Sequence, residues 1–385
     1  MFGVVVDLTW AAAAIGMAWL TAGVLIRCFG APAPMGRYHS LDGLRGMLAV
    51  SVMIHHSAIW YGYATTGNWL LPGSSVYAEL GQGSVLMFFM ITSFLFVSKL
   101  IHAKDGVDWL HMLVSRIMRL TPLYWFAMLC MFCMVGMLTR WQLHEPAALL
   151  FDQAEVWLGY TVSGFPDINH LANTGHLVAD VTWTLVYEWM FYLALPLLAW
   201  LMGRKPGLLP LLFSILVLWW MFDRWHPNLR MVVVFVMGGL TAVLVARAEW
   251  FKSLTASQAA SWLVLAGILA VLALFHSAYD TWPTLILWTC FTLIAGGNSL
   301  FGWLVHPATR QLGDQAYSIY LLHGMTLYAI FHGALGEKLM QTWTFSTYWV
   351  VLLGIVPIVT MLCYVTWRWV EQGGMRLAKR VMAAG

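Results

Sequence analysis

The chain has 385 residues, of which 61% are apolar and only 10% are charged. Water-soluble domains carry charge on about a quarter of their residues, so this composition excludes a soluble globule and predicts an all-α integral membrane protein. The net charge of +3 is too small to indicate a nucleic-acid partner.

Eleven apolar runs approach the length of about 20 residues that a membrane-crossing helix needs. No basic residue precedes the first run, which therefore predicts a retained helix and not a signal peptide. The sixth run is short and is compatible with a tilted or partly interfacial helix. The expected spans are 9–29, 42–63, 83–101, 120–140, 181–202, 208–222, 231–247, 259–276, 284–301, 315–335 and 345–368.

Lysine and arginine are distributed unevenly over the connecting segments. With the N-terminus outside, sixteen of them fall on cytoplasmic segments and four fall outside, namely Arg140, Arg224, Arg230 and Lys338. Basic residues concentrate on the cytoplasmic side of membrane proteins. The bias therefore predicts an external N-terminus, an odd number of spans and a cytoplasmic C-terminus.

The helix expected at 42–63 is unusually polar for a membrane span. Asp42 and Arg45 lie on one face at its cytoplasmic start, and His55 and His56 lie near mid-membrane. Arg45 and His56 are eleven residues apart, about three turns, so they project from the same stripe. Because histidine can act as a general base near neutral pH, two adjacent histidines in register with an arginine favour a functional role. The alternative is a structural pair of histidines satisfied by a neighbouring helix.

Arg116 and Arg119 open the helix expected at 120–140, at its cytoplasmic end. Arginines in this position often extend toward the lipid headgroups, and composition alone favours that interpretation. The guanidinium fork also suits phosphate, so the second interpretation is a clamp for an anionic cytoplasmic ligand.

The longest connection, 141–180, is predicted to lie outside and contains no lysine or arginine. Its aromatic and apolar residues argue against disorder and indicate that part of it lies on, or dips into, the membrane. The span that follows carries Glu188 seven residues into an apolar helix, on the outer side. An unpaired carboxylate would be costly there, so we predict a basic partner from another helix, with a purely structural ion pair as the alternative.

Cysteine and histidine spacing gives no metal signature. Cys130 and Cys133 have CxxC spacing, but no second cysteine or histidine pair accompanies them. We therefore predict small packing residues and no metal site. In the span at 315–335, Tyr320 and His323 share a face, and Ser318 is explained by helix–helix hydrogen bonding.

The polar segments form a series of motifs in a fixed order: LDGLRG at 41–46, FFMITSFLF at 88–96, PLYW at 122–125, TWTLVYEWMFYLALP at 182–196, AYSIYLLHG at 316–324 and WRWVEQ at 367–372. From about residue 38 to 372 this series resembles the membrane acyltransferase type 3 family. Arg45 and His56 match the Arg-x10-His pattern of that family, and Arg116 and Arg119 match its RxxR element. A Thr-Ser pair stands at 92–93, where the family has Ser-Gly.

The resemblance implies a ten-helix core at 38–372 in a bacterial cytoplasmic (inner) membrane. The segment 1–37 then adds one helix and a cytoplasmic loop, and 373–385 is a short basic cytoplasmic tail. The serine-hydrolase-like external domain that is fused to some relatives is not expected.

The resemblance also implies O-acylation with acetyl-CoA, or a related acyl-CoA, as the cytoplasmic donor. Arg116, Arg119 and Arg45 would bind the donor, and His56, Arg45 and Glu188 would form the catalytic set, with Arg45 or a tyrosine stabilising the oxyanion. The acceptor would be a hydroxyl of an extracytoplasmic glycan or lipid-linked saccharide, and membrane lipid surrounds the protein. Residues predicted to bind substrate are His55, Trp183, Tyr187, Tyr192, Tyr320 and His323.

Three alternatives remain open from the sequence. A covalent acyl-enzyme on His56 or a tyrosine would replace direct transfer. A transporter or flippase of a glycan or lipid-linked substrate would also bury polar groups, although the chain shows no internal symmetry of the kind common in transporters. A structural scaffold for glycan assembly is the third alternative. The sequence leaves the oligomeric state open.

Overall fold

The computed structural model describes residues 2–31, 36, 38–103 and 106–377. Within these residues the regular structure is helical, apart from one isolated bridge between Ile168 and Leu171, which confirms the predicted all-α fold. Arg37, Lys104 and most of the predicted basic tail (378–385) lie outside the described residues.

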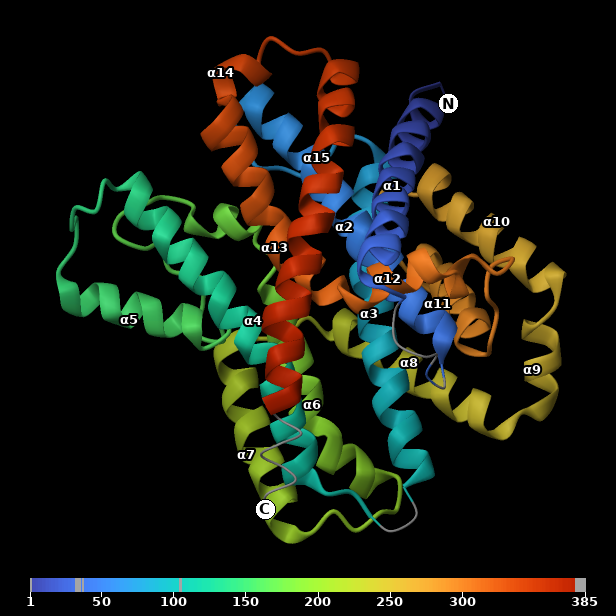
Figure 1. Cartoon of the computed structure of the whole chain (residues 1–385). Helices are drawn as coiled ribbons and strands as arrows, with labels where there is room; N and C mark the ends of the chain where they lie inside the picture. Colours follow the sequence, from blue (N-terminus) through green and yellow to red (C-terminus); the bar gives the residue numbers. More distant parts are fainter. Residues whose placement is uncertain (1, 32–35, 37, 104–105, 378–385) are drawn as a thin grey trace. The chain divides into compact units, whose positions relative to one another are not determined.

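Figure 1 shows the helices in chain order. The α-helices are α1 Phe2–Phe29, α2 His39–Thr66, α3 Ser75–His102, α4 Trp109–Leu138, α5 Ala147–Leu158, α6 Trp183–Leu201, α7 Leu208–Trp225, α8 Leu229–Arg247, α9 Glu249–Thr255, α10 Gln258–Leu274, α11 Thr281–Ala295, α12 Pro307–Asp314, α13 Ala316–Tyr328, α14 Glu337–Met340 and α15 Phe345–Thr366. Short 3₁₀ turns occupy Thr174–Val178 and Trp303–Val305, and π-helical turns occupy Ala329–Leu335 and Trp367–Glu371.

Each of the eleven predicted spans falls on a helix. Among the described residues, seven helices can cross a membrane by length and composition, or eight if the pair α9 and α10, bent by 72°, is one broken span. The helix α2 is not among them, because its polar residues lower its hydropathy, but 19 of its 28 residues are buried within the protein. The helix α11 is apolar but has only 15 residues. The helical positions are therefore confirmed, and the total of eleven crossings stays a prediction.

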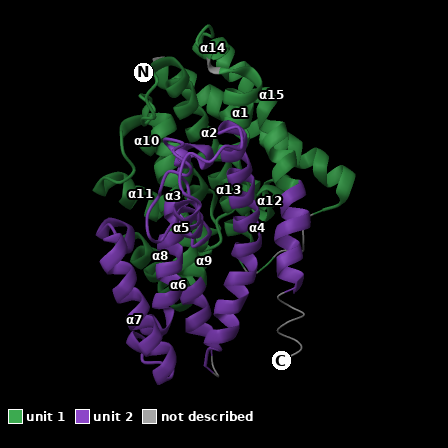
Figure 2. Ribbon diagram, turned by 90° about the vertical axis from the view of Figure 1, so that its left-hand side faces the viewer, with its two compact units in different colours: residues 1–95, 233–364 green, residues 96–232, 365–385 purple. Residues whose placement is uncertain are grey.

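The chain forms two compact units, coloured in Figure 2. Unit 1 comprises 1–95 and 233–364, and unit 2 comprises 96–232 and 365–385. The predicted boundaries at 37 and 372 are boundaries of sequence resemblance and differ from this division, because the N-terminal helix α1 belongs to the same compact unit as α2 and α12.

In unit 1, α2 packs through glycines against α12 and the 3₁₀ turn that precedes it. A Cβ atom on Gly43 would collide with the carbonyl of Leu304, one on Gly46 with the backbone nitrogen of Gly313, and one on Gly313 with the carbonyl of Asp42. The backbones therefore approach more closely than larger side chains would permit, as small-residue interfaces allow in membrane helices. This close packing of α2 positions the histidines described below.

The additional helix α1 is an integral part of unit 1. A stripe of small residues (Ala11, Ala14, Ala18 and Ala22) is buried at helical spacing, and α1 contacts both α2 and α12. The indole of Trp19 donates to the hydroxyl of Thr309 on α12 at 3.2 Å. This helix therefore covers the seam between α2 and α12.

In unit 2, the connection 141–180, which the sequence predicts to be external, returns alongside α4. The hydroxyl of Tyr124, near the midpoint of α4, donates to the carbonyl of Trp157 at the end of α5 over 2.6 Å. Tyr124 lies fourteen residues before the end of α4 at Leu138, a rise of about 21 Å. The connection thus reaches the level of the middle of α4, and its predicted dip into the membrane stays a prediction.

Side-chain hydrogen bonds hold this connection in an ordered shape. Gln153 donates to Glu145 over 2.6 Å and accepts from the backbone of Asn169 over 3.2 Å. The side chain of Asn169 accepts from the backbone of His144 and donates to the carbonyl of Gln142, each over 2.8 Å. The segment is therefore ordered, as its aromatic content predicts.

Candidate active site

The two histidines of α2 meet a third histidine from α13. His56 Nδ1 lies 2.9 Å from His323 Nε2, and the ring centroids are 5.0 Å apart. Gly46 and Gly313, which pack together, each precede their histidine by ten residues. The helices α2 and α12–α13 therefore run parallel and in register, which agrees with the odd number of predicted spans between them.

His55 faces another helix. Its Nδ1 donates to the carbonyl of Tyr77 on α3 over 2.8 Å. Its ring packs against Gly81, where a Cβ atom would collide with the imidazole. These contacts are those of a packed side chain, so they support a positioning role for His55 more than the predicted contact with substrate.

Exposure distinguishes the three rings. His55 is 7% exposed and His323 is 0% exposed, whereas His56 is half-buried. His56 is therefore the most exposed residue of this cluster. The sequence predicts it as the reactive member, and its greater exposure is compatible with that prediction.

The predicted motifs at 88–96 and 316–324 contact each other in unit 1. Tyr320 is buried, and its ring packs edge-on to Phe88, with centroids 5.8 Å apart. The centroids of Tyr320 and His323 are 6.4 Å apart. Tyr320 therefore lies next to the histidine cluster, one turn before His323, as their helical spacing predicts.

Arg45 lies on α2 but far from His56. Eleven residues of helix separate them, about 16 Å along the axis, and Arg45 is half-buried. A guanidinium at that distance is badly placed to stabilise an oxyanion formed at His56, which needs donors about 3 Å from the oxygen. The geometry therefore favours the donor-binding role over the oxyanion role among the two predicted for Arg45.

In unit 2, three predicted residues are connected through one that the sequence did not single out. The guanidinium of Arg116 lies 5.3 Å from the centroid of Phe96, an arrangement typical of a cation–π contact. The ring of Phe96 packs on Tyr192 at 5.0 Å, and the hydroxyl of Tyr192 donates to Glu188 over 3.3 Å. A continuous set of contacts therefore leads from α4 through Phe96 to the acid on α6.

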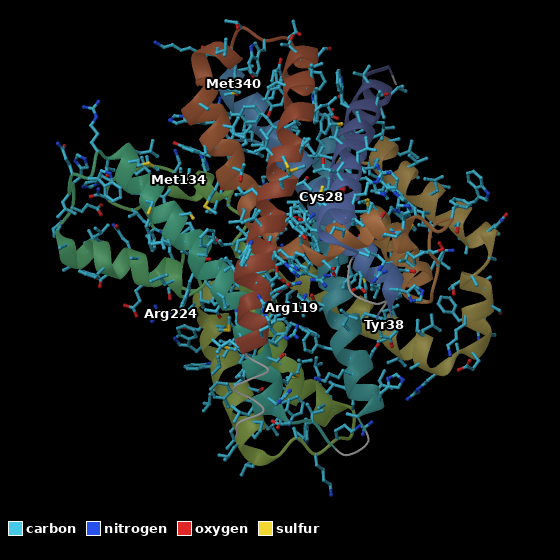
Figure 3. All side chains as sticks on the ribbon, in the orientation of Figure 1. Cys28, Tyr38, Arg119, Met134, Arg224 and Met340 are labelled. Carbon is cyan, nitrogen blue, oxygen red and sulfur yellow. The ribbon has the colours of Figure 1, made fainter. Side chains whose placement is uncertain are left out.

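Arg119 lies one turn beyond Arg116 on α4 and is labelled in Figure 3. Both arginines are half-buried, near a proline that removes one helical hydrogen bond. The carbonyl of Met118 and the ring of Pro122 lie 2.7 Å from where a Cβ on Gly374 would stand. The C-terminal segment of unit 2 therefore packs closely against α4 at the level of the arginine pair.

The aromatic residues around Glu188 are in place, and the connection 141–180 packs beside them. Tyr160, in that connection, packs on Trp189 at 5.2 Å, and its hydroxyl is 2.8 Å from that of Thr121 on α4. Because Thr121 is close to the middle of α4, the connection passes the helix α6 at that level of α4. The sequence could not indicate this contact, because it depends on the path of the connection.

Tyr187 and Trp183 form the outer part of this aromatic group. Their rings are edge-on, with centroids 5.8 Å apart, and the hydroxyl of Tyr187 accepts from the backbone of Asn228 over 2.9 Å. Tyr187 is therefore anchored to the start of α8, so only part of its surface is available to a ligand.

One titratable group of the connection, His176, has a pKa that is shifted in favour of its neutral form. Burial lowers the pKa of His176 below its ordinary value of 6.5, and the neighbouring carboxylates of Asp180 and Asp167 partly offset this effect. His176 Nε2 lies 3.8 Å from an oxygen of Asp180. The fold of this connection is therefore expected to depend on pH.

Sequence reasoning missed Glu79, on the first turns of α3. Its side chain is 2% exposed, and among the described residues neither carboxylate oxygen has a hydrogen-bond partner. The predicted span begins at residue 83, so this acid fell in the preceding connection. Within the described part of the chain, no three His, Cys, Asp or Glu side chains are grouped so that they could hold a metal ion.

Comparison with known proteins gives one match. A family model described as an acyltransferase domain, of the acyltransferase-3 type, covers residues 38–368. No curated protein and no solved structure matches the chain. The matched region contains both units' candidate residues and begins just before α2.

Proposed function

The chain belongs to the acyltransferase-3 family, and from this membership we propose that it transfers an acetyl or related acyl group from cytoplasmic acyl-CoA to a hydroxyl of an extracytoplasmic glycan or lipid-linked saccharide. The observation that carries the proposal is the partly exposed His56, bonded to a buried His323 within the region that matches the family. The protein acts in the cytoplasmic membrane of a bacterium, with its N-terminus outside and its C-terminus inside.

The donor binds through its phosphates. Arg116 and Arg119 lie one turn apart on α4, so their guanidinium groups can address the same anion. Arg45, at the cytoplasmic start of α2, supplies a further positive charge. These arginines bind and orient acyl-CoA and take no part in proton transfer.

His56 is the general base. It removes the proton from the acceptor hydroxyl as the oxygen attacks the thioester carbonyl, and the C–O bond forms. The C–S bond then breaks, and the proton passes from His56 to the thiolate, which releases free CoA. The step needs no oxidant, reductant or metal ion.

Glu188 and the aromatic residues near it bind the acceptor. Tyr192 holds one oxygen of Glu188, and a carboxylate so held can accept hydrogen bonds from sugar hydroxyls. Trp183 and Tyr187 supply aromatic faces suited to the apolar face of a sugar ring. The ordered external connection, free of lysine and arginine, leads from the outer surface toward this group.

The test uses the purified full-length protein in lipid nanodiscs with labelled acetyl-CoA and a crude extract of cell-surface glycans. We expect His56→Gln to reduce transfer by about 10²- to 10⁴-fold, since this is the usual contribution of a general base. The matched control is His276→Gln, which changes an exposed histidine of unit 1. Full activity in a folded His56→Gln protein would show that the base is wrong, and a wild-type protein that never transfers the label would leave the transporter or scaffold alternatives.

The acceptor role of Glu188 is tested separately. Glu188→Gln keeps an oxygen that can accept from Tyr192 but removes the charge, so we expect a higher KM for the acceptor and an unchanged KM for the donor. Glu155→Gln is the matched control, because Glu155 is an exposed acid of the same unit. Equal acceptor KM values for both variants would contradict the assignment.

A further inference from the structure

The histidine cluster contains a chain of hydrogen bonds whose donors and acceptors can be assigned. It begins at the carbonyl oxygen of Ile319, which lies 2.8 Å from His323 Nδ1. A carbonyl oxygen can only accept, so His323 Nδ1 carries a hydrogen. In a neutral imidazole the other nitrogen is then bare, so His323 Nε2 is an acceptor.

The next link fixes the second ring. His56 Nδ1 lies 2.9 Å from the bare His323 Nε2 and 3.1 Å from the carbonyl oxygen of Val52. Both neighbours are acceptors, so His56 Nδ1 carries a hydrogen and shares it between them. His56 Nε2 is therefore the nitrogen that keeps a lone pair.

The opposite assignment is disfavoured by the same contacts. It requires a hydrogen on both nitrogens of His323, hence a positive charge on a ring that is 0% exposed. It also turns a lone pair of His56 Nδ1 toward the carbonyl oxygen of Val52, 3.1 Å away. A buried charge without a stabilising partner is costly, and two facing lone pairs repel each other.

His55 does not compete for this role. Its Nδ1 donates to the carbonyl of Tyr77, and its ring is confined against Gly81 on α3. His55 and His56 are adjacent in sequence, but their rings are nearly perpendicular, with an interplanar angle of 76°. Each ring is therefore oriented by a different helix.

From these contacts we infer that His323 is a positioning residue: it holds His56 in the tautomer that has the hydrogen on Nδ1 and presents the bare Nε2 to the acceptor hydroxyl. The chemical consequence rests on the proposed function, whereas the tautomer is a property of the resting protein. His323 thus does for His56 what a buried carboxylate does for the histidine of a catalytic triad, but as a neutral acceptor.

The same bond assists the transfer step. When His56 Nε2 takes the hydroxyl proton, the ring becomes an imidazolium, and its Nδ1–H still donates to His323 Nε2. The hydrogen bond to a charged donor is stronger than the neutral one, so His323 stabilises the state that exists only during the reaction. The proton then leaves from Nε2 to the thiolate, and both rings return to their starting tautomers.

The kinetic test compares two replacements of His323 in the purified full-length protein. His323→Phe keeps a planar ring but has no acceptor, so we expect kcat to fall by about 10²-fold or more, with KM for donor and acceptor unchanged. His323→Gln can place its amide oxygen where Nε2 stood, so we expect kcat within about tenfold of wild type. The matched control is Thr326→Val, one turn further along α13, whose hydroxyl bonds only to its own helix.

The spectroscopic test reads the tautomer directly. The chain is labelled with ¹⁵N-histidine, and the His56 signals are identified as those missing from the His56→Gln protein. We expect a protonated Nδ1 and a bare Nε2 in the wild type, and a mixture of tautomers in His323→Phe. His55 is the internal reference, because its Nδ1–H is set by Tyr77 and should be the same in both proteins.

The outcomes separate the inference from the proposed function. A protonated Nε2 on His56 in the wild-type protein overturns the inference, whether or not the protein transfers acyl groups. Wild-type kcat in a folded His323→Phe protein also overturns it. If the tautomer is as inferred but no acyl donor is consumed by the wild type, the proposed function fails and the positioning of His56 stands.

Discussion

The substitution Gly46→Ala tests whether the glycine contact between α2 and α12 sets the geometry of the histidine cluster. A Cβ atom at position 46 would lie 2.6 Å from the carbonyl carbon of Leu312 and 2.8 Å from its Cβ. Optimal carbon–carbon separations are about 3.5–4.0 Å, so the two helices would have to move apart by about 1 Å. Such overpacking costs about 1–3 kcal/mol.

The same movement affects the hydrogen bond that lies ten residues further along both helices. If α2 and α13 separate as rigid bodies, the 2.9 Å contact between His56 and His323 lengthens by about 1 Å and leaves the hydrogen-bonding range. A misplacement of about 1 Å can cost about 10²-fold in rate. We therefore expect Gly46→Ala to lower both stability and kcat.

A control on the same helix isolates the contact from the chemistry of the substitution. Gly62 has no atom within 4 Å of its ideal Cβ position. Gly62→Ala should therefore be neutral or stabilise the helix by up to about 1 kcal/mol, because alanine favours helix more than glycine.

Stability can be followed in detergent with a thiol-reactive fluorescent dye, since Cys290 and Cys363 are buried until the protein unfolds. Transfer of labelled acetyl groups reports kcat. If Gly46→Ala unfolds at the same temperature as Gly62→Ala and retains wild-type kcat, then the glycine contact does not control the position of the histidines and the reasoning is refuted.

Three further predictions address the donor, the connection 141–180 and the core. Replacing Arg116 and Arg119 together by alanine should raise KM for acetyl-CoA at least tenfold. KM for S-acetyl-pantetheine should stay unchanged, because this shorter donor lacks the nucleotide phosphates. An equal effect on both donors would exclude the phosphate clamp. Because burial lowers the pKa of His176 in the folded protein, the neutral side chain stabilises the connection above pH 6.5. This contribution is lost as the pH falls through the lowered pKa of the folded state. Limited proteolysis of the connection should therefore accelerate between pH 7.5 and 5, and His176→Gln should flatten that dependence. Tyr348→Phe removes a buried 2.6 Å hydrogen bond to the carbonyl of Ser57 and should cost about 1 kcal/mol or more in thermal unfolding, whereas an unchanged unfolding temperature would mean that the bond contributes nothing.

Hydropathy was sufficient to predict the longer apolar helices but not the short ones, such as α5 and α12. The helix α2 is too polar to be identified as a membrane span from its length and apolar composition. It was nevertheless predicted, because its ionisable residues fall at helical spacing within an otherwise apolar run. The spacing also gave correctly that Arg45 and His56 share a stripe. The same run-based reasoning gave one span for α10 and did not anticipate the separate helix α9 at 72° to it.

Contacts between distant segments could not be predicted from the sequence. His56 and His323 are 267 residues apart, and no periodicity relates them. The sequence therefore assigned His323 to substrate, and only the packing of α2 on α13 shows that its ring lies against His56. The contacts that link Phe96 to Arg116 and to Tyr192 beside Glu188 are a similar case, because they depend on how separate helices pack together within unit 2.

The separation of 267 residues between the paired histidines also has a consequence during synthesis. At about 5–20 residues per second, a ribosome needs roughly 13–53 s to make the chain between them. During that interval α2 is already made, with its arginine, two histidines and glycine-lined face, but α12 and α13 are not. The neighbour that exists first is α1, whose alanine stripe packs within the same unit and which contacts α2 in the finished protein. The order of synthesis thus gives the polar helix one apolar companion from the start, well before the histidine pair can form.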